Sequence, residues 1–163
     1  MRKLFLITLL SILIIAGCSN EQKMTAQEYQ NSASALFDVG NYEGAIKQYE
    51  NLMKYYPENT MALRAQFSIA EIYKNNLDEY DKAIGEYNKI CKDFPESDKA
   101  PNAKFMIAYL YANDMQDLDQ AKISYQEFIN EYPDHMLVPS AEWEIKNLGK
   151  SLDEIEQLNV ISE

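Results

Sequence analysis

One block of sequence occurs three times along this chain with a period of 38. Alanine, tyrosine and proline recur together at this spacing, as Ala45, Tyr49 and Pro57, as Ala83, Tyr87 and Pro95, and as Ala121, Tyr125 and Pro133. A repeat of this length is typical of a solenoid, in which each unit is a helix pair that buries its apolar face only by stacking on its neighbours. The period therefore predicts an all-α solenoid of three helix pairs, and it favours a binding platform over a catalyst.

The apolar periodicity and the prolines place seven helices. Each repeat proline follows an aromatic residue, and proline disfavours the helical conformation of the residue before it, so the second helix of each pair should end there. The expected pairs are 25–38 with 42–55, 60–74 with 79–93, and 98–112 with 117–131. A last helix, 138–148, has no second helix of the repeat kind and should cap the array. Gly40 suits the left-handed residue of a turn, and Gly149 suits a helix C-cap.

Cys91 occupies the repeat position that Met53 and Ile129 hold in the other copies. This position is apolar, and no basic residue at a suitable sequence spacing would lower the pKa of the thiol. We therefore expect Cys91 to be a small hydrophobic side chain in the core rather than a reactive thiol.

The segment 1–17 has the features of a secretory signal peptide. Arg2 and Lys3 give a positive start, residues 4–16 form an apolar run, and the small residues Ala16 and Gly17 close it. As a helix, this apolar run spans about 20 Å, which is short of the ~30 Å hydrocarbon core of a bilayer. A permanent transmembrane helix is therefore the weaker interpretation.

The segment Ile15-Ala16-Gly17-Cys18 resembles the lipobox of bacterial lipoproteins. The resemblance implies that the Cys18 thiol carries diacylglycerol, that the chain is cut before Cys18, and that the new N-terminus is acylated. Two or three acyl chains give stable anchoring, at about 0.8 kcal/mol per buried methylene. Ser19, where some lipoproteins have Asp, implies a place on the outer membrane facing the periplasm, or on the outer face of the cytoplasmic membrane in a cell without one. Ordinary cleavage that leaves a free thiol is the alternative.

These features divide the chain into a signal peptide (1–17), a lipidated tether (18–24), a solenoid with its cap (25–149) and an acidic tail (150–163). Loss of the signal peptide removes two of the 15 basic residues and none of the 26 acidic ones, so 13 basic residues face 26 acidic ones and the net charge is −13. Such a charge disfavours binding to nucleic acid and close contact with anionic lipid. We expect the charge chiefly to keep a tethered protein soluble, with an acidic docking surface as the alternative.

The sequence contains no catalytic or metal-binding motif. His135 is the only histidine, so neither a triad based on histidine nor a pair of histidine ligands can form. A glycine-rich phosphate loop is also absent. We therefore expect no enzymatic activity, no metal and no cofactor apart from the covalent lipid.

The repeat resembles the tetratricopeptide repeat. In that family the second helix carries a small residue, an aromatic residue four positions later and a proline twelve positions after the small one, as in Ala45, Tyr49 and Pro57. The resemblance covers about residues 25–149 and implies a right-handed superhelix. The unit is longer than the family's usual length of about 34 residues. Its aromatic-Pro-acid link is similar to that of envelope proteins such as the β-barrel assembly lipoprotein and the Tol-Pal coordinator.

The family register places the first helix of each pair on a concave face and implies eleven residues there that contact a partner. They are Gln30, Phe37, Arg64, Phe67, Glu71, Lys74, Asn102, Phe105, Tyr109, Asn113 and Trp143. Phe67, Phe105 and Trp143 are each separated by one repeat period, and such a ladder of rings is suited to hold an extended or helical peptide. Packing of the same rings between neighbouring helices is an equally open interpretation.

Together these features predict a membrane-anchored scaffold or adaptor lipoprotein that binds a protein partner or peptide segment in the bacterial cell envelope. The expected setting is outer-membrane assembly or envelope maintenance. Two alternatives stay open at this point. One is an accessory protein that binds a glycan or a small peptide, and the other is a structural lipoprotein that associates with itself.

Overall fold

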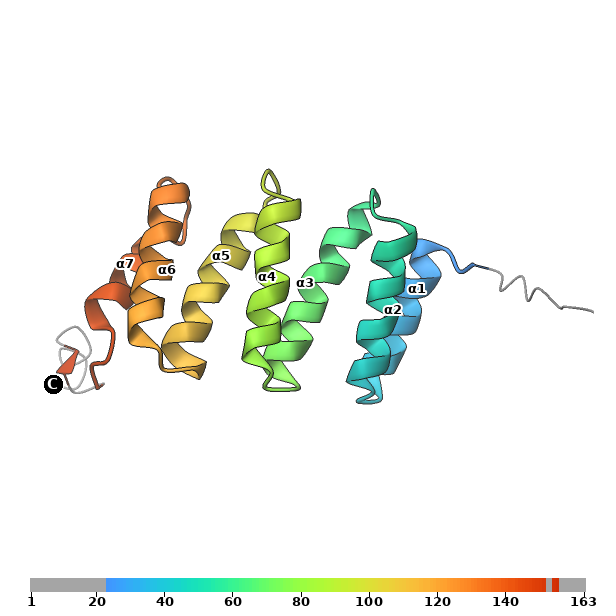
Figure 1. The fold of residues 1–163 in the computed structure, drawn as a ribbon, viewed down its shortest axis with the longest axis horizontal. Helices are drawn as coiled ribbons and strands as arrows, with labels where there is room; N and C mark the ends of the chain where they lie inside the picture. Colours follow the sequence, from blue (N-terminus) through green and yellow to red (C-terminus); the bar gives the residue numbers. More distant parts are fainter. Residues whose placement is uncertain (1–22, 152–153, 156–163) are drawn as a thin grey trace, which may run out of the picture.

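The computed structural model of the chain describes residues 23–151 and 154–155. The expected signal peptide, Cys18 and most of the acidic tail therefore lie outside the described residues. Within the described part, all regular structure is helical, and the helices stand side by side in chain order (Figure 1). The helices are α1 (Ala26–Asp38), α2 (Tyr42–Tyr55), α3 (Thr60–Asn75), α4 (Tyr80–Asp93), α5 (Ala100–Tyr109), α6 (Leu118–Glu131) and α7 (Val138–Asn147). The predicted all-α repeat solenoid is confirmed.

The second helices of the three pairs repeat residue by residue. Helices α2, α4 and α6 have 14 residues each, and their first residues are separated by one repeat period. Each ends at an aromatic C-cap with φ between −137° and −128°, whose backbone N–H donates to the carbonyl four residues earlier; these caps are Tyr56, Phe94 and Tyr132. The proline that follows each cap keeps this residue out of the helical region. The expected ends of the second helices are confirmed.

The first helix of the third pair differs from the expected one. Helix α5 begins at Ala100, two residues later than predicted, with Pro101 in its first turn. Its continuation is a short π-helix, η1 (Leu110–Asp114), which the sequence did not predict. Among the helices described, none combines the length and the apolar character that crossing a membrane requires.

Each turn within a helix pair contains one left-handed residue at the same repeat position. These residues are Gly40 (φ 76°), Asp78 (φ 53°) and Gln116 (φ 56°). Gly40 was expected, but Asp78 and Gln116 were not, because side chains larger than glycine adopt this conformation at a cost. The repeat therefore imposes the backbone geometry of the turn even where the residue does not favour it. Gly149 also has a positive φ (75°), as expected for the end of the last helix.

Apolar packing continues from pair to pair instead of forming one central core. The repeat alanines Ala45, Ala83 and Ala121 are completely buried, which lets the two helices of each pair approach closely. Each helix packs mainly on its neighbours in the chain. In addition, α1 packs against α3, whereas α2 and α4 make less contact with each other. Helices α1 and α3 therefore lie nearer to each other than α2 and α4 do.

Cys91 lies at the edge of the second apolar cluster and is half-buried rather than fully buried. Its thiol points to the carbonyl oxygen of Ala100, at 3.6 Å. Burial raises the pKa of the Cys91 thiol, although the charge of Lys104 opposes this rise. Lys104 belongs to the next helix, so its proximity to Cys91 could not be found from spacing along one helix. The raised pKa favours the protonated thiol, which agrees with the expected packing role.

We expect Gln116→Gly to raise the free energy of unfolding by roughly 0.5–1 kcal/mol, because glycine adopts the left-handed conformation without the steric cost that glutamine has. The greater entropy of the unfolded chain with glycine offsets only part of this gain. The reverse change, Gly40→Gln, should lower the free energy of unfolding by a similar amount. A Cβ at Gly40 meets no atom within 4 Å, so only the backbone conformation is tested there. Urea denaturation followed by circular dichroism measures both changes, and shifts of the same sign would contradict the explanation.

Candidate protein-binding surface

The eleven residues predicted to contact a partner all lie on the first helices of the pairs or on their continuations. Gln30 and Phe37 lie on α1, the four from Arg64 to Lys74 lie on α3, Asn102, Phe105 and Tyr109 lie on α5, Asn113 lies in η1 and Trp143 lies on α7. The structure distributes these residues among three hollows and a set of contacts between neighbouring helices.

The first hollow, here called the α1–α3 hollow, has a volume of about 460 Å³. It is lined by Phe37, Tyr49, Phe67, Ser68, Glu71, Ile72, Asn75 and Asn76. Three of the predicted residues, Phe37, Phe67 and Glu71, come together here from α1 and α3. Phe37 is 39% exposed and packs edge-on against Tyr42, so its ring is held in place at the rim while part of it remains accessible.

Glu71 is held in a fixed position in the α1–α3 hollow by two donors. Its Oε1 accepts a hydrogen bond from the Tyr87 hydroxyl, and its Oε2 accepts one from the Asn75 Nδ2 at 2.8 Å. Burial raises the pKa of Tyr87, and the hydrogen bond and negative charge of Glu71 raise it further. The Tyr87 hydroxyl therefore stays protonated and remains a donor to the carboxylate.

The rings of Phe67 and Phe105 are half-buried and pack within their own helix pairs. Phe67 meets Tyr87 edge-on with ring centroids 5.5 Å apart, and Phe105 meets Tyr125 in the same way at 5.4 Å. Both members of the second contact lie one repeat period after those of the first, so the repeat reproduces the geometry. The two rings thus contribute to packing, and whether they also bind a partner stays a prediction. Phe105 additionally packs against Phe128 at 5.6 Å.

Several predicted polar residues are engaged within the array. Lys74 places its Nζ 5.6 Å from the ring centroid of Tyr109, which joins α3 to α5. Asn102 and Asn113 each donate their side-chain amide to a backbone carbonyl one helical turn earlier. Gln30 is half-buried on α1. Of these residues, only Asn113 also lines one of the three hollows described here.

The second hollow, here called the C-terminal hollow, has a volume of about 620 Å³ and lies beside the capping helix. Asn113 and Trp143, both predicted, line it together with Gln116, Leu118, Asn147 and Ile155 among others. Trp143 is 37% exposed, whereas Ile155 is buried. The described part of the tail therefore packs on the end of the array.

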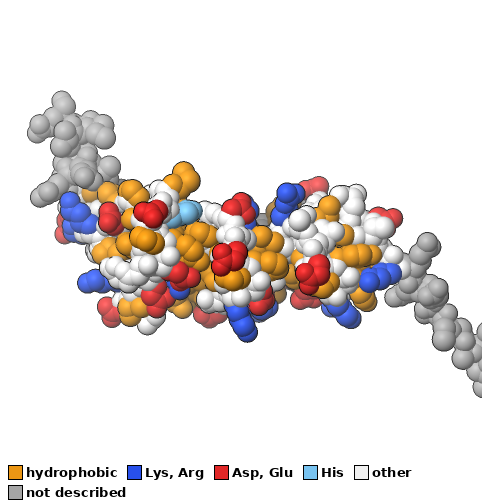
Figure 2. Space-filling view, turned by 90° about the horizontal axis from the view of Figure 1, so that it is seen from above, with side chains coloured by type: hydrophobic (Ala, Val, Ile, Leu, Met, Phe, Trp, Pro, Cys, Tyr) orange, Lys and Arg blue, Asp and Glu red, His pale blue; other side chains and the backbone are white. Residues whose placement is uncertain are grey.

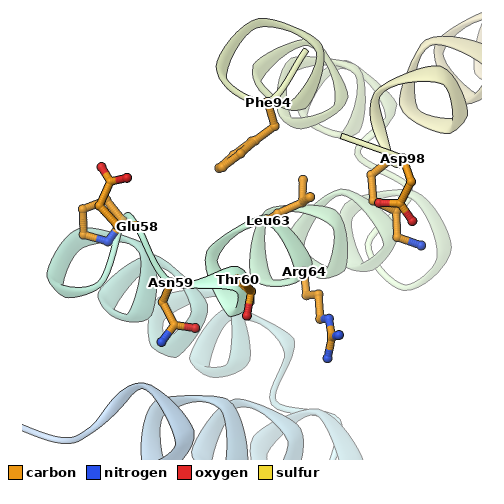
Figure 3. A pocket seen from close by; sticks show the side chains of 9 residues that line it. Glu58, Asn59, Thr60, Leu63, Arg64, Phe94 and Asp98 are labelled. Carbon is orange, nitrogen blue, oxygen red and sulfur yellow. The ribbon is translucent and has the colours of Figure 1, made fainter. Parts of the chain in front are cut away.

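The third hollow lies between the links that follow α2 and α4 and has a volume of about 780 Å³. Arg64 lines it, and the sequence did not point to its other residues. In Figure 3 the Phe94 ring and the Leu63 side chain lie between Glu58 on one side and Asp98 on the other. The signal that could have indicated it is the aromatic-Pro-acid link, which recurs in every copy and is longer than the family's usual one. Figure 2 looks from above onto the long side of the array on which these links lie, and it shows apolar side chains along the array, interrupted by charged groups.

The fold and these hollows define a class of protein, namely a helical-repeat protein whose candidate binding surface is formed by stacked helix pairs. Within the described ranges, no three histidine, cysteine or acidic side chains come together as metal ligands. The model of the tetratricopeptide repeat family matches residues 13–59, 64–97 and 102–135. The chain therefore belongs to the tetratricopeptide repeat family, whose repeats serve as scaffolds that bind other proteins. No curated protein matches the chain.

The two equivalent tyrosines Tyr87 and Tyr125 should respond in opposite ways to removal of the hydroxyl. Tyr125 is completely buried, and its hydroxyl has no hydrogen-bond partner among the described residues. We expect Tyr125→Phe to raise the free energy of unfolding by about 1 kcal/mol, because it removes a buried unpaired polar group. Tyr87→Phe should lower it by about 1–2 kcal/mol, because it takes a donor from Glu71. Chemical denaturation of both variants tests this, and a loss of stability in Tyr125→Phe would contradict it.

Proposed function

We propose that this protein is a membrane-anchored adaptor that holds another protein of the bacterial cell envelope on the face formed by α1, α3, α5 and α7. The observation that carries the proposal is the α1–α3 hollow, where Phe37, Phe67 and Glu71 meet from two repeat units. A partly exposed ring beside a fixed carboxylate offers both apolar area and a directional polar contact, which is the composition of interface anchors. The setting we propose is outer-membrane assembly or envelope maintenance.

The attachment of the N-terminal end supports a position close to the membrane. The Tyr56 hydroxyl donates to the carbonyl oxygen of Met24 at 2.8 Å, and Thr25 forms a capping box with Glu28 at the start of α1. The Nζ of Lys23 lies 4.5 Å from the ring centroid of Tyr55. The chain is thus tied to the solenoid from Lys23 onward. If Cys18 carries the lipid, the tether reaches at most about 20 Å, because an extended residue spans roughly 3.5 Å.

Removal of two exposed rings should strongly weaken partner binding. Phe37→Ala with Trp143→Ala removes the two partly exposed rings of the predicted surface while leaving the half-buried Phe67 and Phe105 in the packing. A tagged chain purified from detergent-solubilised membranes should capture a defined envelope protein, identified by mass spectrometry. The double variant should reduce that capture at least tenfold, since each hot-spot ring typically contributes about 2 kcal/mol.

Ile123→Ala is the matched control for the double variant. Ile123 is 51% exposed on α6, a second helix, and its loss should leave capture unchanged. Equal capture by wild type and the double variant would refute the proposed face. Saturable binding of a glycan fragment without a partner protein would favour the glycan- or peptide-binding accessory protein. Self-association that grows with concentration in sedimentation would favour the structural lipoprotein.

Cys18→Ser should abolish attachment of lipid to the chain. The change removes the thiol that we propose to be acylated, and with it the buried methylenes that give stable anchoring at about 0.8 kcal/mol each. Fractionation should find the wild type with the membranes. The variant should keep its signal peptide, and it should be either soluble or retained at the membrane by that peptide alone. Intact mass measurement should show two or three acyl chains on the wild type and none on the variant. An unmodified wild-type chain would refute the lipid anchor.

A further inference from the structure

Resting on the proposed function, we propose that the α1–α3 hollow receives a lysine or arginine side chain of the partner protein. The hollow combines an apolar wall with a fixed carboxylate, and these are the two surfaces that such a side chain requires. Its methylene stem needs apolar contact, and its charged head needs an anion. The assignment follows from the rings, the carboxylate and the charge of the chain.

Three aromatic rings line the hollow, from three different helices. They are Phe37 of α1, Tyr49 of α2 and Phe67 of α3, with Ile72 completing the apolar wall. The faces of aromatic rings carry negative potential and attract ammonium and guanidinium groups. The chain itself shows this preference nearby, because the Nζ of Lys99 lies 5.7 Å from the ring centroid of Phe67.

Glu71 has no cation paired with it in the described structure. The ion pairs found there involve Glu50, Glu79, Glu86, Glu127 and Glu131, but not Glu71. Its two donors, the Tyr87 hydroxyl and the Asn75 amide, are neutral and orient the carboxylate without cancelling its charge. Lys74, on the same helix, places its Nζ over the ring of Tyr109 instead. The charge at the hollow is therefore available to a cation from outside.

The repeat does not require a carboxylate at this position. The equivalent residues in the other units are Ser34, Tyr109 and Asn147. The carboxylate at this repeat position is thus particular to the second unit, although the backbone around it repeats. Asn75, at the edge of the hollow, uses its amide nitrogen for Glu71 and leaves its Oδ1 as a second acceptor.

The charge of the whole chain favours a basic partner. The formal net charge is −11, with 26 acidic residues against 15 basic ones. A field of this sign steers cationic segments toward the surface and repels acidic ones. The field acts on any basic segment, whereas the carboxylate in the hollow selects one side chain of that segment.

Peptide selection with a single-charge variant tests this assignment. The full chain, purified in non-ionic detergent and immobilised, is used to select random heptapeptides on phage, in parallel with Glu71→Gln and Glu43→Gln. Glutamine at 71 keeps an oxygen for the Tyr87 hydroxyl, and its amide nitrogen can donate to the Asn75 Oδ1 once the Asn75 side-chain amide turns over. The circular dichroism melt should therefore stay within a few degrees. Glu43 is exposed at the start of α2, and its replacement changes the net charge by the same amount without touching the hollow.

We expect lysine or arginine to be enriched at least fivefold at one peptide position by the wild type and by Glu43→Gln, but not by Glu71→Gln. For a selected peptide, norleucine in place of the basic residue should weaken binding at least tenfold to the wild type, measured by fluorescence anisotropy. The same replacement should change binding to Glu71→Gln by less than twofold.

The outcomes separate this inference from the adaptor function. Selected peptides without a basic preference, or a preference that survives in Glu71→Gln, would overturn the assignment of the hollow and leave the adaptor function standing. If no peptide is enriched, the captured partner itself serves as the probe, and unchanged capture by Glu71→Gln would overturn the assignment. Absence of both enriched peptides and a captured partner would overturn the adaptor function as well.

Discussion

The close contact between paired helices at three alanines is the constraint on which the rest of the structure depends. Ala45, Ala83 and Ala121 are completely buried, and a larger side chain there would separate the helices of each pair. Four residues later in each unit, a buried tyrosine fills the space beside the contact. Because each pair buries its other face only against its neighbours, stability is shared along the array and no unit has a core of its own. Exposed positions on the first helices are not needed for this contact, so they can serve binding.

At some positions the side chain is needed for the packing of every unit, and at others it can differ from unit to unit. The edge-on contacts of Phe67 with Tyr87 and of Phe105 with Tyr125 recur with nearly the same geometry, so they belong to the architecture. Glu71 belongs to the other kind, because its counterparts have unrelated side chains. Binding specificity in a repeat protein can arise at such free positions, where a change of side chain leaves the helix stacking unaltered. The α1–α3 hollow joins both kinds, since Phe67 forms its wall and Glu71 supplies its charge.

Much of the fold followed from the sequence because its signals are local. The prolines after the aromatic caps set the ends of α2, α4 and α6, and these ends match the prediction. The π-helix after α5 and the left-handed Gln116 were not predicted, because their residue types favour neither conformation and the neighbouring units impose it. Of the candidate site, the sequence placed the contributing residues on the correct helices. It could not sort them into hollows and packing contacts, because that depends on distances between residues of different units.

The sequence by itself determined the architecture of this protein: a three-unit helical array with a cap, no catalytic motif and a strongly acidic balance. The period and the prolines are enough for this, since helix ends and apolar faces are set within one unit. Only the tertiary structure decided that Phe37, Phe67 and Glu71 share one hollow, that Phe105 is engaged in packing, and that Cys91 lies near Lys104. The physical reason is that these relations join side chains from different helices, and the stacking of one pair on another fixes which of them meet.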